Sequence, residues 1–207
     1  MGWVEAAQKI LTRESPEVAC EWNSYFMRRG FRSSACFPFR ELLCTILPSV
    51  SKGDSILDAG CGVGIDLLQL ANEGYTNLQG IDANVEHVSA ARAVMTSLGL
   101  DIPVSVGDVN ALAGEYQVIM ALDFMYNTSV PTVPDMLARV ESHLLSGGYY
   151  AFDLFEFERE MKTSRRYYTV SEVHSAVVRS GRFSVVLTVT REFGGAKMNF
   201  YVVRRNT

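Results

Sequence analysis

The stretch from Ser55 to Leu68 constrains the fold of this chain more than any other. It reads as an apolar strand, a glycine turn and the start of a helix in immediate succession. Gly60, Gly62 and Gly64 alternate directly after Asp58, so the backbone can adopt conformations closed to other residues and approach a ligand closely. This pattern predicts a cradle for a nucleotide-type cofactor.

The run Asp58-Ala-Gly-Cys-Gly-Val-Gly64 resembles the first motif of the class I S-adenosylmethionine-dependent methyltransferases. A dinucleotide fingerprint has the spacing G-x-G-x-x-G, whereas Ile65 stands where its third glycine would fall. An NAD-type site and an ordinary tight turn remain the alternatives. The resemblance extends from about Phe37 to Val203, and it implies S-adenosylmethionine as cofactor, S-adenosylhomocysteine as product, and Asp58 and the three glycines as cofactor-binding residues.

A second acidic landmark is Asp82, which ends the expected strand Asn77–Asp82. A carboxylate at the end of such a strand is placed to accept hydrogen bonds from both ribose hydroxyls of a nucleotide. Capping of the following helix is the alternative role. Asn84 starts that helix, expected over Val85–Leu98, and we count Asn84 among the cofactor-binding residues.

A third landmark, Gly107-Asp108, follows a short expected strand. The resemblance implies that Asp108 bonds the exocyclic amine of adenine while the backbone of Val109 meets the ring edge; an ordinary Gly-Asp turn is the alternative. Leu122 ends the apolar run Tyr116–Leu122, which is typical of a buried parallel strand. Because the carboxyl ends of such strands open into the binding crevice, we expect Leu122 to contact the cofactor.

The loop after Leu122 should reach the methyl group that is transferred. Asp123 and Tyr126 are the candidate catalytic residues, with a structural bond as the alternative for Asp123. A general base is needed only if the nucleophile must lose a proton. Asp123-Phe-Met-Tyr126 lacks the prolines of the Asn-Pro-Pro-Tyr-like tetrad in the family's amide- and adenine-methylating branches, which argues against glutamine side chains and DNA adenine as acceptors.

Alternating strands and helices predict the fold class. We expect an α/β fold with a doubly wound, mostly parallel seven-stranded sheet, helices on both faces, and an antiparallel strand pair near Ser184–Thr190 and Met198–Val203. A helix over Val133–Leu145 should end at Ser146-Gly147-Gly148, and Thr169 and Glu172 match a capping box. Residues 1–207 are expected to form one methyltransferase-like domain, with a Rossmann-like core over 51–207.

Residues 1–50 are expected to form a helical N-terminal cap. Ser15-Pro16-Glu17 resembles a helix start, and Trp22, Tyr25 and Phe26 follow at helical spacing. This aromatic face either packs on the sheet or forms a lid that excludes water from the reacting centre.

Composition limits the partners. A net charge of −4 gives no general attraction to nucleic acid. The four cysteines show no C-x-x-C pair and no zinc-site spacing, so we predict no metal site and a cytoplasmic chain. No apolar run is long enough to predict a membrane span. The three histidines are expected on helices, His87 and His143 on solvent faces and His174 in a structural role.

We therefore predict an enzyme that methylates an O, N or C atom of a small molecule. The alternatives are a non-methylating S-adenosylmethionine-binding regulator or pathway enzyme on the same fold, and an RNA methyltransferase. The sequence leaves the oligomeric state open.

Overall fold

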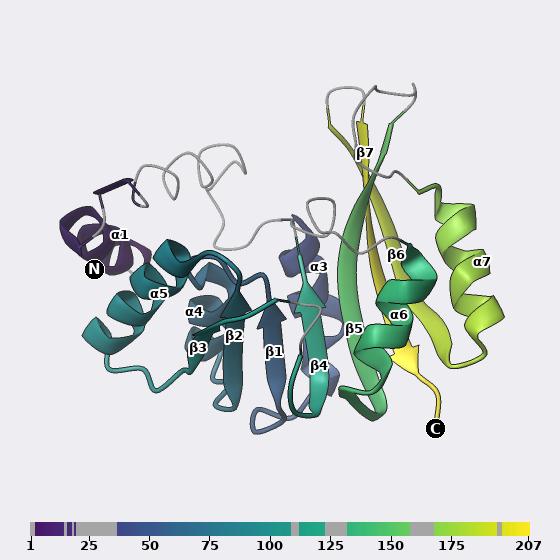
Figure 1. Cartoon of the computed structure of the whole chain (residues 1–207), viewed down its shortest axis with the longest axis horizontal. Helices are drawn as coiled ribbons and strands as arrows, with labels where there is room; N and C mark the ends of the chain where they lie inside the picture. The colour runs from purple at the N-terminus through teal and green to yellow at the C-terminus, as the bar shows by residue number, and fades with distance from the viewer. Residues whose placement is uncertain are drawn as a thin grey trace. The chain divides into compact units, whose positions relative to one another are not determined.

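The computed structural model describes residues 3–14, 16, 17, 19, 37–108, 112–122, 132–157, 168–193 and 196–207. The chain divides into two compact units, Met1–Ala111 and Leu112–Thr207. Figure 1 labels the helices and strands of both.

The first unit is built on three parallel strands in the order β3-β2-β1. They are β1 (Ile56–Ala59), β2 (Leu78–Asp82) and β3 (Val104–Val106). The helix α4 (Ile65–Asn72) connects β1 to β2, and α5 (Val85–Ser97) connects β2 to β3. Because the strands are parallel, the glycine turn, Asp82 and Gly107 all lie at the carboxyl ends of strands, on the same edge of this sheet.

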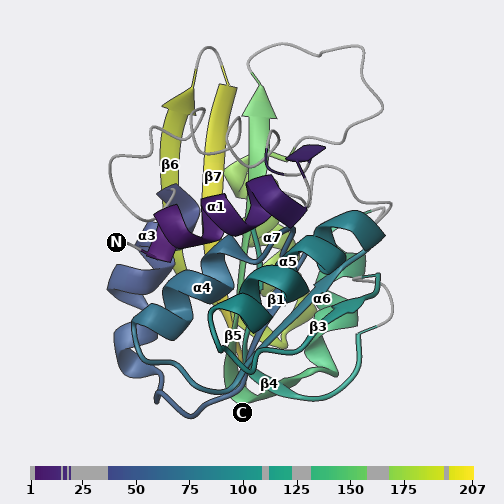
Figure 2. The same ribbon diagram turned by 90° about the vertical axis from the view of Figure 1, so that its left-hand side faces the viewer.

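Helices at the start of the chain complete the first unit. α1 (Trp3–Glu14) packs on α5, as Figures 1 and 2 both show, and it buries Ala7 and Leu11 completely. α3 (Phe37–Thr45) and the short η1 (Leu47–Ser49) lead into β1. The expected helix around Trp22, Tyr25 and Phe26 lies outside the described residues.

The second unit has its four strands in the order β4-β5-β7-β6. They are β4 (Tyr116–Ala121), β5 (Leu144–Phe157), β6 (Phe183–Phe193) and β7 (Ala196–Arg205). β4 and β5 are parallel, whereas β7 pairs antiparallel with both β5 and β6.

Two helices, α6 (Val133–Glu141) and α7 (Val170–Ser180), pack together in this second unit. The predicted capping box at the start of α7 is confirmed, with Thr169 and Glu172 bonded reciprocally. Gly181 ends α7 in the left-handed conformation at φ 64°.

The predicted boundary between α6 and β5 was wrong. The helix ends at Glu141 instead of Leu145, and Leu144 already pairs with Tyr116 in the sheet. Gly147, at φ 74°, lies in an irregularity of β5, not at the end of a helix. A glycine pair that can cap a helix can equally form a β-bulge, since both need the left-handed conformation.

The fold class is confirmed. The described residues form seven strands, parallel in the first part of the chain and ending in an antiparallel pair, together with six α-helices. The grouping of 1–207 into one domain and the lid role of residues 1–50 stay predictions. No helix in the described part of the chain combines the length and the apolar character needed to cross a bilayer.

Candidate cofactor site

The glycine turn has the left-handed backbone that the sequence predicts. Gly60, Gly62 and Gly64 have φ angles of 86°, 53° and 80°. The backbone amides of Gly60 and Cys61 both donate to the carbonyl of Ile81, at 2.8 and 3.0 Å, which ties the turn to the end of β2. Among the described residues, no atom lies within 4 Å of a Cβ placed on Gly62, so they leave that side of the turn open.

Asp82 lies beside this turn at the carboxyl end of β2. Its Oδ2 accepts a hydrogen bond from the amide of Gly62, and its Oδ1 accepts one from the amide of Asn84, both at 2.8 Å. A carboxylate has about four lone-pair positions, so acceptor capacity remains for two further donors. The side chain is 15% exposed, and its orientation is fixed by backbone groups on both sides.

Asn84 is the N-cap of α5. Its Oδ1 accepts from the amides of Glu86 and His87 at 2.9 and 3.4 Å. Helix capping was the alternative role predicted for Asp82, but the side chain that caps α5 is that of Asn84.

His87 was not among the predicted site residues. Its Nδ1 lies 3.9 Å from Asp82 Oδ1, and the side chain is 27% exposed instead of facing solvent as predicted. The available signal was its position in the first helical turn after a strand-end carboxylate.

The base of the turn is closely packed and acidic. Asp58 is 4% exposed on β1, and Cys61 is buried. Burial, followed by the charges of Asp58, Asp82 and Asp66, raises the pKa of the Cys61 thiol far above its ordinary value. The thiol therefore stays protonated and is a poor nucleophile.

Gly80 is a second residue that the sequence analysis missed. A Cβ there would lie 2.7 Å from Leu67 Cδ1 and 2.9 Å from Cys61 Sγ. Only glycine at this strand position leaves room for the turn and for α4, and a glycine in the interior of a strand was the available signal.

Asp108 lies at the end of the neighbouring strand. The amide of Gly107, directly before it, donates to the carbonyl of Asp82 at 3.0 Å. Asp108 is exposed, while Val109 lies outside the described residues. The first unit thus brings the glycine turn, Asp82, Asn84 and Asp108 to adjacent strand ends.

The remaining predicted site residues belong to the second unit. Leu122 directly follows β4 and is 7% exposed. Asp123 and Tyr126 lie outside the described part of the chain.

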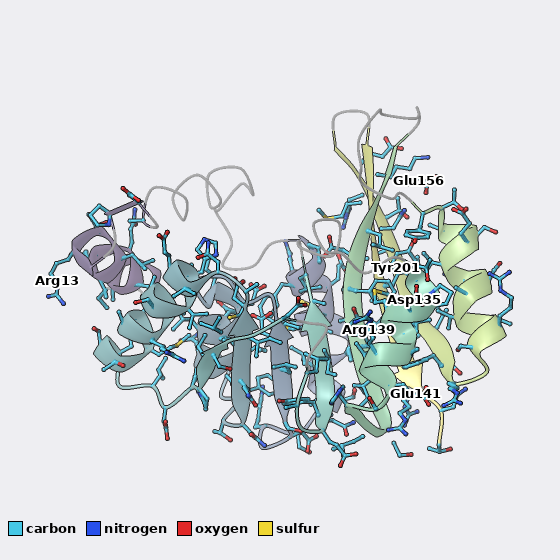
Figure 3. The ribbon with its side chains drawn as sticks, in the orientation of Figure 1. Arg13, Asp135, Arg139, Glu141, Glu156 and Tyr201 are labelled. Atoms are coloured by element: carbon cyan, nitrogen blue, oxygen red, sulfur yellow. The ribbon has the colours of Figure 1, made fainter. Side chains whose placement is uncertain are left out.

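A separate polar cluster occupies β5, β6 and β7 of the second unit. Asn199 accepts from Thr190 at 2.7 Å and donates to Glu156 at 3.2 Å. The nearby Tyr201 is fully buried, and its hydroxyl has no hydrogen-bond partner among the described residues. Burial and then the charge of Glu156 raise the pKa of Tyr201; Figure 3 shows both side chains.

His143 and His174 also belong to the second unit. His143 lies in the turn after α6, partly buried against the carbonyl of Gly114 at 2.9 Å, so its predicted place on a solvent-facing helix was wrong. His174 is on α7 as expected, and its Nε2 lies 2.9 Å from Thr188 Oγ1. Across the described residues no group of three or more His, Cys, Asp or Glu could hold a metal ion.

Part of the chain matches a known protein family. A family model described as a methyltransferase domain matches residues 56–148, from β1 into β5. The tRNA U34 carboxymethyltransferase of Haemophilus influenzae is 25% identical over 153 residues, which cover 70% of this chain and 42% of that protein. This chain thus spans less than half the length of that curated relative.

Two solved structures share the fold at low sequence identity. Magnesium protoporphyrin IX methyltransferase from Synechocystis PCC 6803, with bound S-adenosylmethionine, superposes with a TM-score of 0.68 at 14% identity, covering 100% of this chain and 98% of that one. TehB from Haemophilus influenzae gives a TM-score of 0.69 at 17% identity, covering 88% of this chain and 66% of that one.

Proposed function

We propose that this chain, which has the class I S-adenosylmethionine-dependent methyltransferase fold, binds S-adenosylmethionine in its first unit and transfers the methyl group to an acceptor. The observation that carries the proposal is Asp82. Its carboxylate is fixed beside a left-handed glycine turn and keeps acceptor capacity for two donors, as a ribose diol requires.

The other described residues fit the same cofactor. In the described part of the chain no atom lies within 4 Å of a Cβ on Gly62, so the backbone can approach the ligand. Asp108, one strand away, is the proposed partner of the adenine amine. We keep Asp58, Asn84, Val109 and Leu122 as proposed contacts.

The cofactor supplies an activated methyl group on its sulfonium, and the protein contributes orientation and exclusion of water. Asp123 and Tyr126 stay the proposed residues for holding the acceptor or removing its proton. They follow β4 at its carboxyl end, the end where ligands bind in α/β folds.

We favour a small molecule as acceptor, because a net charge of −4 gives no general attraction to a nucleic acid. Similarity to tRNA U34 carboxymethyltransferase favours tRNA as the second candidate. Retention of label by tRNA after incubation with methyl-labelled S-adenosylmethionine would support tRNA, and its binding should then weaken steeply with salt. A chain that binds the cofactor but labels neither tRNA nor small molecules would support the non-methylating alternative.

Isothermal titration with S-adenosylmethionine tests cofactor binding. Asp82→Ala removes the ribose acceptor and leaves the amides of Gly62 and Asn84 without their partner, so we expect affinity to fall at least tenfold. Asp101→Ala is the matched control, since Asp101 is an exposed aspartate outside the site, and it should bind as wild type. Unchanged binding by Asp82→Ala would reject the ribose assignment.

A further inference from the structure

His87 and Asp82 lie close together at the edge of the glycine turn. Nδ1 of His87 lies 3.9 Å from Oδ1 of Asp82, which is too far for a direct hydrogen bond. Two hydrogen bonds of about 2.8 Å that meet at an angle of about 90° span such a distance. A single oxygen atom can therefore bond to both side chains at once.

The chemistry of the two side chains selects the group that fits between them. An ionised carboxylate only accepts hydrogen bonds, whereas an imidazole N–H donates one. The bridging group must therefore donate to Asp82 and accept from His87. With Nδ1 protonated, a ligand hydroxyl does both, as would a water molecule that the hydroxyl displaces, but an ammonium cannot accept and an ether oxygen cannot donate.

Backbone contacts hold the carboxylate of Asp82 and the first turn of α5, which carries His87. The amides of Gly62 and Asn84 fix the carboxylate of Asp82, and the backbone amide of His87 is bonded to the N-cap oxygen of Asn84. Both side chains are mostly buried, with 27% of His87 and 15% of Asp82 exposed, so competition from water is reduced.

We propose that His87 and Asp82 clamp one ribose hydroxyl of the cofactor, and that His87 thereby selects ribose over deoxyribose. The inference rests on the proposed function, because it assumes that the ribose lies at Asp82. The proposed function gives the ribose only the hydrogen-bond acceptors of Asp82, and the clamp adds His87 as a hydrogen-bond donor.

Titration calorimetry with S-adenosylhomocysteine and its 2′-deoxy and 3′-deoxy analogues tests the clamp. His87→Leu removes the donor, and we expect it to weaken binding of S-adenosylhomocysteine about fivefold to tenfold, as for the loss of one hydrogen bond. For the analogue that lacks the clamped hydroxyl, wild type and His87→Leu should bind equally well. His87→Asn, whose amide nitrogen can replace Nδ1, should restore part of the affinity.

Glu86→Gln, at the exposed neighbouring position, should leave all three affinities unchanged. Equal weakening of all three ligands by His87→Leu, or no weakening, would overturn the clamp. If wild type fails to bind S-adenosylhomocysteine, the proposed function fails, and adenosine replaces it as probe. Adenosine binding that His87→Leu weakens would still support the clamp, and its absence would overturn it.

Discussion

At the scale of single residues, Gly80 shows how closely the glycine turn packs against β2. Leu67 of α4 and Cys61 of the turn lie so close to Gly80 that a Cβ there would clash with both. Gly80 therefore helps to set the position of the cradle.

Gly80→Ala would place a methyl carbon 2.7 Å from Leu67 Cδ1 and 2.9 Å from Cys61 Sγ. We expect the free energy of unfolding to fall by about 1–3 kcal/mol, as is usual for overpacking, and cofactor affinity to fall with it. Urea denaturation measures the first effect. At Gly53 no atom lies within 4 Å of an added Cβ, so Gly53→Ala should cost less than about 0.5 kcal/mol. Similar losses for both variants would contradict the packing argument.

Single residues also show which parts of the site the sequence predicts. The left-handed conformation of Gly60, Gly62 and Gly64 follows from the motif, because only glycine adopts it without strain. His87 could not be placed in the same way. Helical periodicity gives the face of α5 on which a residue lies, but contact with Asp82 also depends on how the turn between β2 and α5 is bent.

At the scale of elements, a complete capping box fixes the N-terminus of α7. The amide of Thr169 donates to Glu172 Oε2 at 2.7 Å, and the amide of Glu172 donates to Thr169 Oγ1 at 3.2 Å. The backbone hydrogen bond from Thr169, and then its side-chain hydrogen bond, lower the pKa of Glu172. Four residues of sequence were enough to predict this cap, because all its partners are local.

Thr169→Ala should lower the free energy of unfolding by about 1 kcal/mol at pH 7. Ser171→Ala, at an exposed position of the same helix, should lower it by less than about 0.5 kcal/mol.

The contribution of Glu172 to the free energy of unfolding is fully present above its unfolded-state pKa of about 4.3, and it is lost as the pH falls through the lower folded-state pKa. Wild type and Glu172→Gln should therefore differ most at pH 7 and converge in acid. Urea denaturation across this pH range checks the convergence, and a difference that persists in acid would contradict it.

The boundary between α6 and β5 marks where local sequence is insufficient. Ser146-Gly147-Gly148 fits a helix end, yet Leu144 pairs with Tyr116, and Arg204 Nε donates to the carbonyl of Gly147 at 3.0 Å. Arg204 lies on β7, far along the chain, so no local pattern could have revealed the bulge. Pairing between distant strands decided this boundary.

At the scale of the whole molecule, most of the proposed cofactor contacts belong to the first unit. Hydrogen exchange with and without S-adenosylhomocysteine should therefore show added protection at Gly60–Gly64 and Asp82–His87, and little change in β6 and β7. Asp82→Ala should lose this pattern. Equal protection throughout both units would contradict a cofactor site centred on Asp82.

The order β5-β7-β6 has a consequence for synthesis on the ribosome. β5 and β6 both emerge before β7, the strand that joins them, so each presents an unpaired backbone edge until β7 arrives. β6 is rich in β-branched residues and exposes Val186, which is the composition of a strand that pairs readily with foreign chains. Until β7 has emerged, the nascent second unit therefore exposes strand edges that the finished sheet covers.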